Sequence, residues 1–201
     1  MLRLYDFLPS GNGYKVRLLL TQLGIPFERI QVEIFKGESR TPDFLTKFPN
    51  GRIPAVEFDD GRTLFESNAI MSYFADGTRF MPADRFERAQ VLQWMFFEQY
   101  SHEPNIATIR SWLHDAGLND ERRAVLESKR KLGYDALRVM QSHLKERSWF
   151  VGERYSIADI ALYAYTHVAD EGGFDMSGYP SIRAWLDRVR AEPGHIPITL
   201  G

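Results

Sequence analysis

A short loop near the start of the chain combines residue types that could bind an anion. It runs from Leu8 to Gly13 (LPSGNG) and leads into a helical pattern at Tyr14. Small residues in front of a helix leave backbone N–H groups available to an anion. The Ser10 hydroxyl could donate a hydrogen bond that favours a thiolate over a thiol. Taken alone, Ser10 and Asn12 would also suit a plain turn that caps the helix.

The turn Asn50–Pro54 (NGRIP), which precedes a strand pattern, is a second candidate. A cis Ile53–Pro54 peptide bond would present the Ile53 backbone as an edge, to which a peptide-like ligand could pair as an added strand does. Only ~5–6% of X–Pro bonds in folded proteins are cis. By itself, the turn therefore favours a proline that simply starts the strand.

Glu66 and Ser67 follow another strand pattern and stand at the start of a helix. The Ser67 hydroxyl and backbone N–H could hold a carboxylate while the Glu66 side chain meets an ammonium group. These two groups side by side suit the α-amino-acid end of a γ-glutamyl ligand. An ordinary helix cap beside an exposed acid is the simpler interpretation of the pair alone.

Alternating strand and helix patterns carry these three segments. Apolar residues alternate in the strand patterns and recur at helical spacing in the helix patterns. They predict strands at residues 2–7, 30–34, 55–58 and 62–65, and helices at residues 14–23, at 42–48 and from Ser67 onward. The first two strands should be parallel because they are joined across a helix, and the last two should form an antiparallel hairpin. This is the order of a thioredoxin-like domain with a mixed four-stranded sheet.

Beyond residue 77 the strand signal disappears. We predict a linker at residues 78–83 between a thioredoxin-like domain at 1–77 and an all-helical bundle at 84–201. Helix starts are indicated by Asp84 with Glu87, by Asn119, and by Ser156 with Asp159. The last helix is expected at residues 180–190.

The composition excludes several classes of protein. The chain has no cysteine, which rules out disulfides, thiolate zinc sites and CxxC redox motifs, and its formal net charge of -2 lacks the basic character of nucleic-acid-binding proteins. No apolar run reaches the roughly 18 residues of a membrane span, and the N-terminal pattern is not that of a signal peptide. No clustered histidines or carboxylates point to a metal. We therefore expect a cytoplasmic protein whose sulfur chemistry, if it has any, uses a ligand's sulfur.

Together, the three segments resemble a known family. PSGNGYKVRLLL, PNGRIPAVEFDDGRTLFESNAI and SIADIALY, in this order and at these distances, closely resemble the soluble glutathione S-transferases. The resemblance covers nearly the whole chain, including the closing YPSIRAWLDRVRAEPG. It implies a glutathione-binding first domain, a helical second domain that supplies the pocket for an electrophile, and a homodimer.

The resemblance also implies how the thiol is activated. In the family, the active residue after the first strand is Tyr, Ser or Cys, and Ser10 matches the serine position. Asn12 competes with Ser10, since some bacterial members hold the thiolate with an asparagine near this point, and Tyr5 aligns less well with the tyrosine class. Because the chain has no cysteine, it departs from the classes that work through their own thiol.

The same matching implies how glutathione is held. Ile53 would pair its backbone with the cysteinyl part, next to the family's cis-proline at Pro54, and Glu66 with Ser67 would grip the γ-glutamyl group. Arg52 stands where many members have lysine. Lys36 could lie near the glycyl carboxylate.

The resemblance implies conjugation of glutathione to a small hydrophobic electrophile. The same binding site would also serve a glutathione-dependent peroxidase or disulfide reductase, in which ligand thiols do the redox work. A non-catalytic glutathione- or ligand-binding protein with this fold is the third possibility, because binding and turnover are separable.

Overall fold

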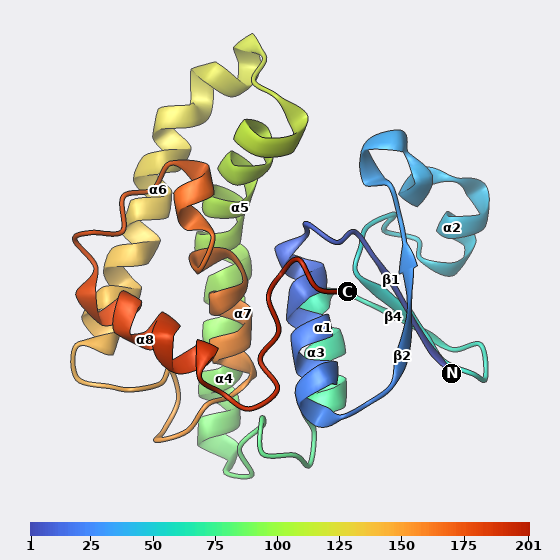
Figure 1. Cartoon of the computed structure of the whole chain (residues 1–201), viewed down its shortest axis with the longest axis horizontal. Coiled ribbons are helices and arrows are strands. Elements are labelled where there is room, and N and C mark those ends of the chain that lie inside the picture. The colour runs from blue at the N-terminus through green and yellow to red at the C-terminus, as the bar shows by residue number, and fades with distance from the viewer. The chain divides into compact units, whose positions relative to one another are not determined.

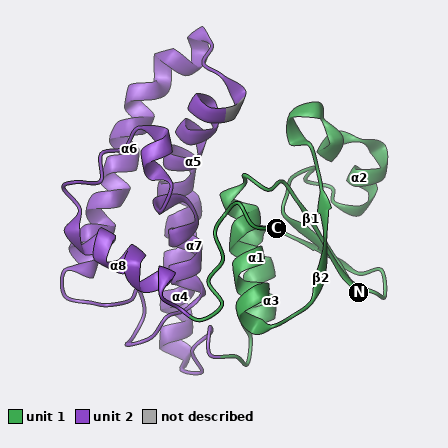
Figure 2. Ribbon diagram, in the orientation of Figure 1, with its two compact units in different colours: residues 1–78, 193–201 green, residues 79–192 purple. Residues whose placement is uncertain are grey.

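The chain folds into two compact units in a computed structural model that describes residues 1–201, apart from the side chain of Asp115. Unit 1 contains residues 1–78 and 193–201, and unit 2 contains residues 79–192 (Figure 2). The sequence pattern predicts residues 193–201 to belong to the helical domain, whereas in the structure they pack with the N-terminal unit.

Unit 1 is built on a four-stranded mixed sheet with the strand order β2-β1-β3-β4. The strands are β1 (Leu2–Asp6), β2 (Phe27–Gln31), β3 (Ala55–Glu57) and β4 (Thr63–Phe65). β1 and β2 are parallel, and the β3–β4 hairpin is antiparallel, as the sequence predicts. β3 also pairs antiparallel with β1, which places the hairpin beside the first strand.

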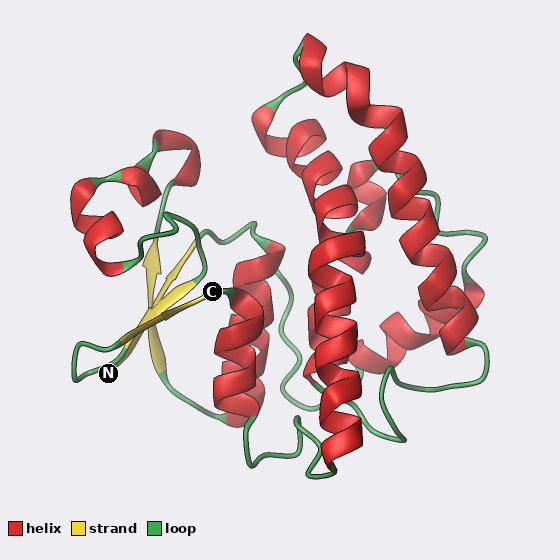
Figure 3. Ribbon diagram, turned by 180° about the vertical axis from the view of Figure 1, so that it is seen from behind, coloured by secondary structure: helices red, strands yellow, loops and turns green.

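Helices cover both faces of this sheet (Figures 1 and 3). α1 (Gly11–Leu23) and α3 (Ser67–Ala75) pack together on one face, where Leu4 of β1 belongs to a core that includes residues of both helices. α2 (Pro42–Lys47) lies on the other face, where Tyr5 packs against a second core. Leu4 and Tyr5 separate in this way because successive strand side chains point to opposite faces.

Two boundaries in unit 1 differ from the sequence predictions. β2 covers Phe27–Gln31 rather than residues 30–34, because its partner β1 ends at Asp6, opposite Gln31. Ile34 therefore begins a short 3₁₀ turn, η1 (Ile34–Lys36), which η2 (Glu38–Arg40) follows. The first helix starts at Gly11, earlier than its apolar periodicity indicates. Its first three residues are small or polar and therefore give no apolar signal.

Unit 2 contains the helices α4 (Arg85–Phe97), α5 (Glu103–Ser111), α6 (Asp120–Leu144), α7 (Ile157–Thr166) and α8 (Pro180–Arg190). The helix whose start Asp84 and Glu87 indicate passes into a π-helical turn, η3 (Glu98–His102). Pro104 explains the change, because it lacks the N–H that would continue the α-helical ladder. A second π-helical turn, η4 (Trp112–Ala116), follows α5, and a 3₁₀ turn, η5 (Ala169–Gly172), follows α7.

A buried capping box starts α7, as the sequence predicts. The Asp159 carboxylate accepts hydrogen bonds from the Ser156 N–H at 3.0 Å, the Phe150 N–H at 3.2 Å and the Trp185 indole at 3.0 Å. Burial nevertheless raises the pKa of Asp159 to about 6, although these donors oppose the shift. The carboxyl group therefore joins the α7 N-terminus to α8.

We predict a pH dependence of stability from Asp159. Its pKa is raised in the folded state, so between about pH 4 and about pH 6 the folded chain holds a proton that the unfolded chain has lost. Relative to the variant Asp159→Asn, the wild type should lose about 3 kcal/mol of unfolding free energy as the pH rises through this window, and no more above it. Urea unfolding of both proteins at several pH values tests this. A difference that stays constant with pH contradicts it.

We also predict that Gly13 in α1 tolerates no side chain. A Cβ at this position would overlap the buried carboxylate of Asp6 at the end of β1. The variant Gly13→Ala should lose about 3 kcal/mol of unfolding free energy or more. Neither β1 nor α1 can move away from the new methyl group without disrupting the packing between them. Gly178→Ala is the matched control, since a Cβ there meets nothing within 4 Å. Equal effects of the two variants in urea unfolding would refute the prediction.

Candidate functional site

Ser10 is the N-cap residue of α1. Its hydroxyl oxygen accepts a hydrogen bond from the Gly13 N–H at 3.3 Å, and its own N–H donates to the Phe7 carbonyl at 2.8 Å. The hydroxyl acts as an acceptor in the first bond and keeps its hydrogen to donate. The cap that the loop sequence suggests is therefore present, and it leaves a donor at the positive end of the helix.

Asn12, in the first turn of α1, is joined to the start of α3. The Ser67 hydroxyl donates to the Asn12 side-chain oxygen at 3.4 Å, and the Lys15 ammonium donates to the Ser67 hydroxyl at 3.4 Å. Both are long hydrogen bonds. Lys15 has no exposed surface, and Ser67 is 5% exposed. A buried positive charge therefore lies directly behind the Ser67 hydroxyl.

Glu66 connects the start of α3 to the turn before β3. Its carboxylate accepts from the Asn50 amide at 3.2 Å, and the Asn50 side-chain oxygen accepts from the Arg52 N–H at 3.2 Å. Glu66 occupies the N-cap position of α3 with a φ of 71°, the conformation that glycine adopts more easily. The sequence pattern predicts Ser67 as this cap, but Ser67 is the first residue of the helix.

The Ile53–Pro54 peptide bond is cis, as the family resemblance implies. β3 begins at Ala55 in both of its pairings, so the Ile53 backbone lies outside the ladders to β1 and β4. Pro54 is buried and Ile53 is partly exposed. A backbone edge is therefore present at the position where the sequence analysis expected one.

The structure brings most of the predicted site residues together in unit 1. One series of hydrogen bonds and peptide bonds connects Asn12, Ser67, Glu66 and the turn that contains Arg52. Ser10 stands two residues before Asn12 in sequence. Hydroxyl, amide, carboxylate, ammonium and backbone groups thus gather where the loop after β1, the turn before β3 and the start of α3 meet. This set offers partners for a ligand that carries a positively charged group, a negatively charged group and a peptide backbone.

Tyr5, the third candidate for holding a thiolate, is engaged elsewhere. Its hydroxyl donates to the Glu57 carboxylate at 2.6 Å and accepts from the Lys47 ammonium at 3.3 Å, on the α2 face of the sheet. Hydrogen bonds from Lys47 and then from Tyr5 lower the pKa of Glu57. The Tyr5 ring packs edge-on against Phe44 and Phe48, which fixes its direction.

The remaining candidate, Lys36, and three residues of the helical unit do not belong to this hydrogen-bonded set. Lys36 is exposed at the end of η1. In unit 2, Ile106 has no exposed surface, and Arg110 pairs with Glu171 at 2.6 Å, so both belong to the interior of the helical unit. Tyr100 is 87% exposed. Within the described residues, no three His, Asp or Glu side chains are grouped so that they could hold a metal ion.

Sequence reasoning missed Lys15 and Asn50 as members of the site. A lysine in a helix is usually solvated, and only the position of Lys15 one turn before Leu18 and Leu19, on the same helical stripe, could have suggested its burial. Asn50 belongs to a turn motif in which asparagine is common, so its sequence position gave no separate signal.

Comparison with known protein families decides which family this fold belongs to. The family described as glutathione S-transferase, N-terminal domain, matches residues 1–76, and the one described as glutathione S-transferase, C-terminal domain, matches residues 93–193. The chain belongs to the glutathione S-transferase family. No helix in the described part of this glutathione S-transferase homologue is long and apolar enough to cross a membrane.

Individual relatives agree with this assignment. The crystal structure of a glutathione S-transferase from Pseudomonas fluorescens Pf-5 is 53% identical, covers 98% of each chain and has a TM-score of 0.96. A disulfide-bond oxidoreductase of Escherichia coli K12 is 32% identical over 96% of this chain and 92% of its own length. A second Pseudomonas fluorescens family member, solved with two glutathione bound, is 28% identical, covers 96% and 89% of the two chains, and has a TM-score of 0.82.

We predict that Glu66 stores backbone strain. An unusual positive φ costs about 1–3 kcal/mol for a residue with a Cβ and almost nothing for glycine. The variant Glu66→Gly should therefore be about 1 kcal/mol more stable than Glu66→Ala, after the larger entropy of glycine in the unfolded chain is counted. Ala69→Gly in the same helix is the control and should lose about 1 kcal/mol. If no strain is stored, the glycine variant at position 66 should instead be less stable than the alanine variant, by about the 1 kcal/mol that the control loses.

Proposed function

We propose that this glutathione S-transferase homologue binds glutathione in unit 1, stabilises its thiolate and conjugates it to a small hydrophobic electrophile. The observation that carries the proposal is the hydrogen-bonded series Lys15–Ser67–Asn12 beside the cis Ile53–Pro54 bond. This series connects the groups that would hold the γ-glutamyl end of the peptide to the loop that contains Ser10. The turn at Ile53–Pro54 would hold the other end.

The α-amino-acid end of glutathione is assigned to the start of α3. The Glu66 carboxylate would accept from the ammonium group, the Ser67 N–H would donate to the α-carboxylate, and the Ser67 hydroxyl would turn its one hydrogen from Asn12 to the same carboxylate. Lys15 supports this assignment, because its buried ammonium donates to the Ser67 hydroxyl and adds positive charge behind the carboxylate. Strain at Glu66 also fits a ligand-holding role, since sparsely populated conformations cluster at such sites.

The rest of the tripeptide is assigned to the turn before β3. The Ile53 backbone would pair with the cysteinyl part as an added strand does, with Pro54 fixing the turn. Arg52, which is exposed, would attract the glycyl carboxylate. These contacts would anchor the ligand at both ends and so hold its sulfur close to the start of α1.

Ser10 and Asn12 are assigned to the thiolate. A free thiol has a pKa of about 8.5 and is mostly protonated at neutral pH. Hydrogen bonds from the Ser10 hydroxyl and the Asn12 amide, together with the positive end of α1, would favour the ionised form. Tyr5 is left out of this role because its hydroxyl is held by Glu57 on the other face of the sheet.

The reaction then needs little further chemistry from the protein. The thiol proton passes to solvent, the thiolate forms a carbon–sulfur bond with the electrophile, and a leaving group departs with its electron pair. Holding the thiolate and the electrophile together supplies the larger part of the acceleration. A homodimer in the manner of the family completes the proposal.

A second candidate function is glutathione-dependent disulfide reduction. It is favoured by the 32% identical relative named a disulfide-bond oxidoreductase, and by the relative solved with two glutathione bound. Because this chain has no cysteine, two glutathione thiols would have to supply the electrons, and oxidised glutathione would be the product. Product analysis separates the two functions, since conjugation yields a thioether and consumes no disulfide.

The test is the ultraviolet absorbance of bound thiolate across pH, after calorimetry has given the affinity for glutathione. The pKa of the bound thiol should lie at least about one unit below that of the free thiol. The variant Ser10→Ala should raise it by about one unit, which corresponds to the loss of one hydrogen bond to a charged group. Tyr5→Phe also removes a hydroxyl from unit 1 and should leave this pKa unchanged.

Each other outcome has a definite meaning. An unchanged pKa in Ser10→Ala and a raised one in Asn12→Ala would assign the thiolate to asparagine. Binding without any low-pKa thiolate would favour a carrier over a transferase. Absence of binding at millimolar glutathione would overturn the proposed function.

A further inference from the structure

The C-terminal strap, residues 193–201, lies along α1 within unit 1 (Figures 1 and 2). The Tyr14 hydroxyl donates to the Ile196 carbonyl at 2.6 Å and lies 3.2 Å from the Nε2 atom of His195. Tyr14 itself has no exposed surface. The strap is therefore fixed to the first turns of α1, although it contains no helix or strand.

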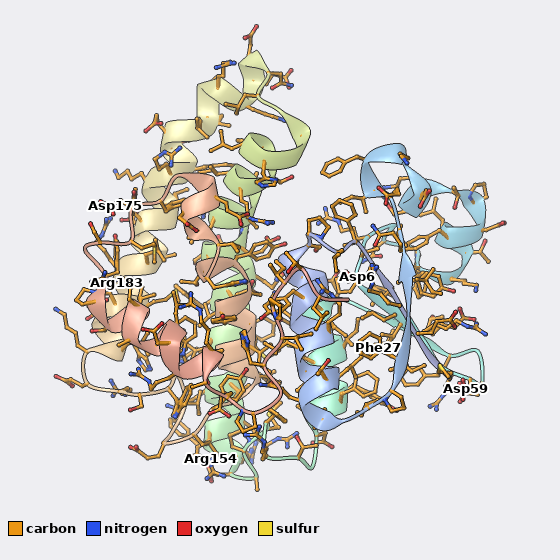
Figure 4. The ribbon with its side chains drawn as sticks, viewed as in Figure 1. Asp6, Phe27, Asp59, Arg154, Asp175 and Arg183 are labelled. Carbon is orange, nitrogen blue, oxygen red and sulfur yellow. The ribbon has the colours of Figure 1, made fainter. Side chains whose placement is uncertain are left out.

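Arg17, one turn further along α1, makes the second attachment. Its guanidinium group forms an ion pair with Asp6 at 2.8 Å, and both side chains are fully buried. Figure 4 labels Asp6 beside the start of α1. The same guanidinium donates to the Ile198 carbonyl at 3.1 Å and to the Leu200 carbonyl. The strap thus supplies backbone acceptors to a buried positive charge.

The remaining Arg17 bond reaches the loop that contains Ser10. Arg17 donates to the Leu8 carbonyl at 2.7 Å, two residues before Ser10. The strap also touches this loop directly, since a Cβ at Gly201 would lie 2.7 Å from the Leu8 side chain. One guanidinium group therefore holds the end of β1, the strap and the Ser10 loop at the same time.

We propose that the C-terminal strap, acting through Arg17, is a positioning element that fixes residues 7–10 and with them the Ser10 hydroxyl. A guanidinium group has five donors in a fixed planar arrangement, so its orientation depends on all of its acceptors. Removing the two strap carbonyls would leave Arg17 open to water and free to turn. The Leu8 carbonyl would then lose its fixed partner, and the Ser10 hydroxyl would lose its direction.

The strap's effect on the thiol rests on the proposed function, but its effect on the loop does not. Arg17 touches no ligand in this scheme, and the strap is remote in sequence from every residue assigned to glutathione. Its role is therefore distinct from binding. A purely structural role would lower stability and leave both loop mobility and thiol ionisation as they are.

Two variants test the proposal while keeping the Asp6–Arg17 pair. One is the chain shortened to end at Pro193, which removes the two strap carbonyls that accept from Arg17. The other is Tyr14→Phe, which keeps the strap but removes its hydrogen bond to Ile196. Tyr134→Phe is the matched control, because it removes a tyrosine hydroxyl that accepts from the Asp175 N–H at 2.9 Å within unit 2.

The first measurement is hydrogen exchange of the backbone amides of residues 8–13. We expect exchange about tenfold faster in the shortened chain, a smaller increase in Tyr14→Phe, and no change in Tyr134→Phe. The second measurement is the pKa of bound glutathione, which should rise by about half a unit to one unit in the shortened chain while the affinity changes less.

Unchanged exchange at residues 8–13 in the shortened chain would overturn the proposal. So would faster exchange with an unchanged thiol pKa, because the loop would then move without consequence for Ser10. If the wild type binds no glutathione, the proposed function fails. The exchange data then decide by themselves whether the strap holds the loop.

Discussion

The buried ion pair between Asp6 and Arg17 is the interaction on which unit 1 depends most. Burial raises the pKa of Asp6 and lowers that of Arg17, while the charge of each partner opposes the shift of the other. Such a pair is costly unless its other polar atoms are satisfied. Backbone carbonyls accept from the two terminal guanidinium nitrogens of Arg17, and Gly13 provides the room for Asp6 by having no side chain. The end of β1, the start of α1 and the two loops beside them are therefore determined together.

The candidate site follows from this arrangement. With the start of α1 fixed against β1, Asn12 is held within reach of Ser67, and the hairpin β3–β4 brings Glu66 back to the turn at Asn50. Each of these side chains comes from the end of an element rather than from its middle. The sheet contributes positions, and the connections contribute the chemistry, as is general for functional sites on rigid scaffolds.

Much of this was accessible from the sequence, because local patterns determine it. The capping box at Ser156 and the last helix are where their residue types indicate, and the element order of unit 1 is the predicted one. Errors arose where partners distant in sequence decide. The alternation at Ile34 continues past the end of the strand that β2 pairs with, and the cap of α3 moved to Glu66 because the chain turns there with a positive φ.

The burial of Lys15 and the path of residues 193–201 could not be predicted in this way. Residues 13–20 of α1 are all buried, so the charged residues among them lie in the interior, which a helical pattern with polar positions does not indicate. The closing segment PGHIPITLG has neither helical nor strand periodicity, and only its acceptors for Tyr14 and Arg17 determine its course. Tertiary hydrogen bonds of this kind leave no periodic trace in a sequence.

Unit 1 is discontinuous along the chain, and this affects the order in which the protein can be assembled during synthesis. Domains generally fold as they emerge from the ribosome, starting from the N-terminal side. Here the sheet and its helices emerge early, but Arg17 acquires its last acceptors only after the whole helical unit has been translated. A nascent chain therefore passes through a long interval in which the sheet and helices of the first unit are present but Arg17 lacks its acceptors in residues 193–201. Ribosomal products that stop within unit 2 would never leave that state.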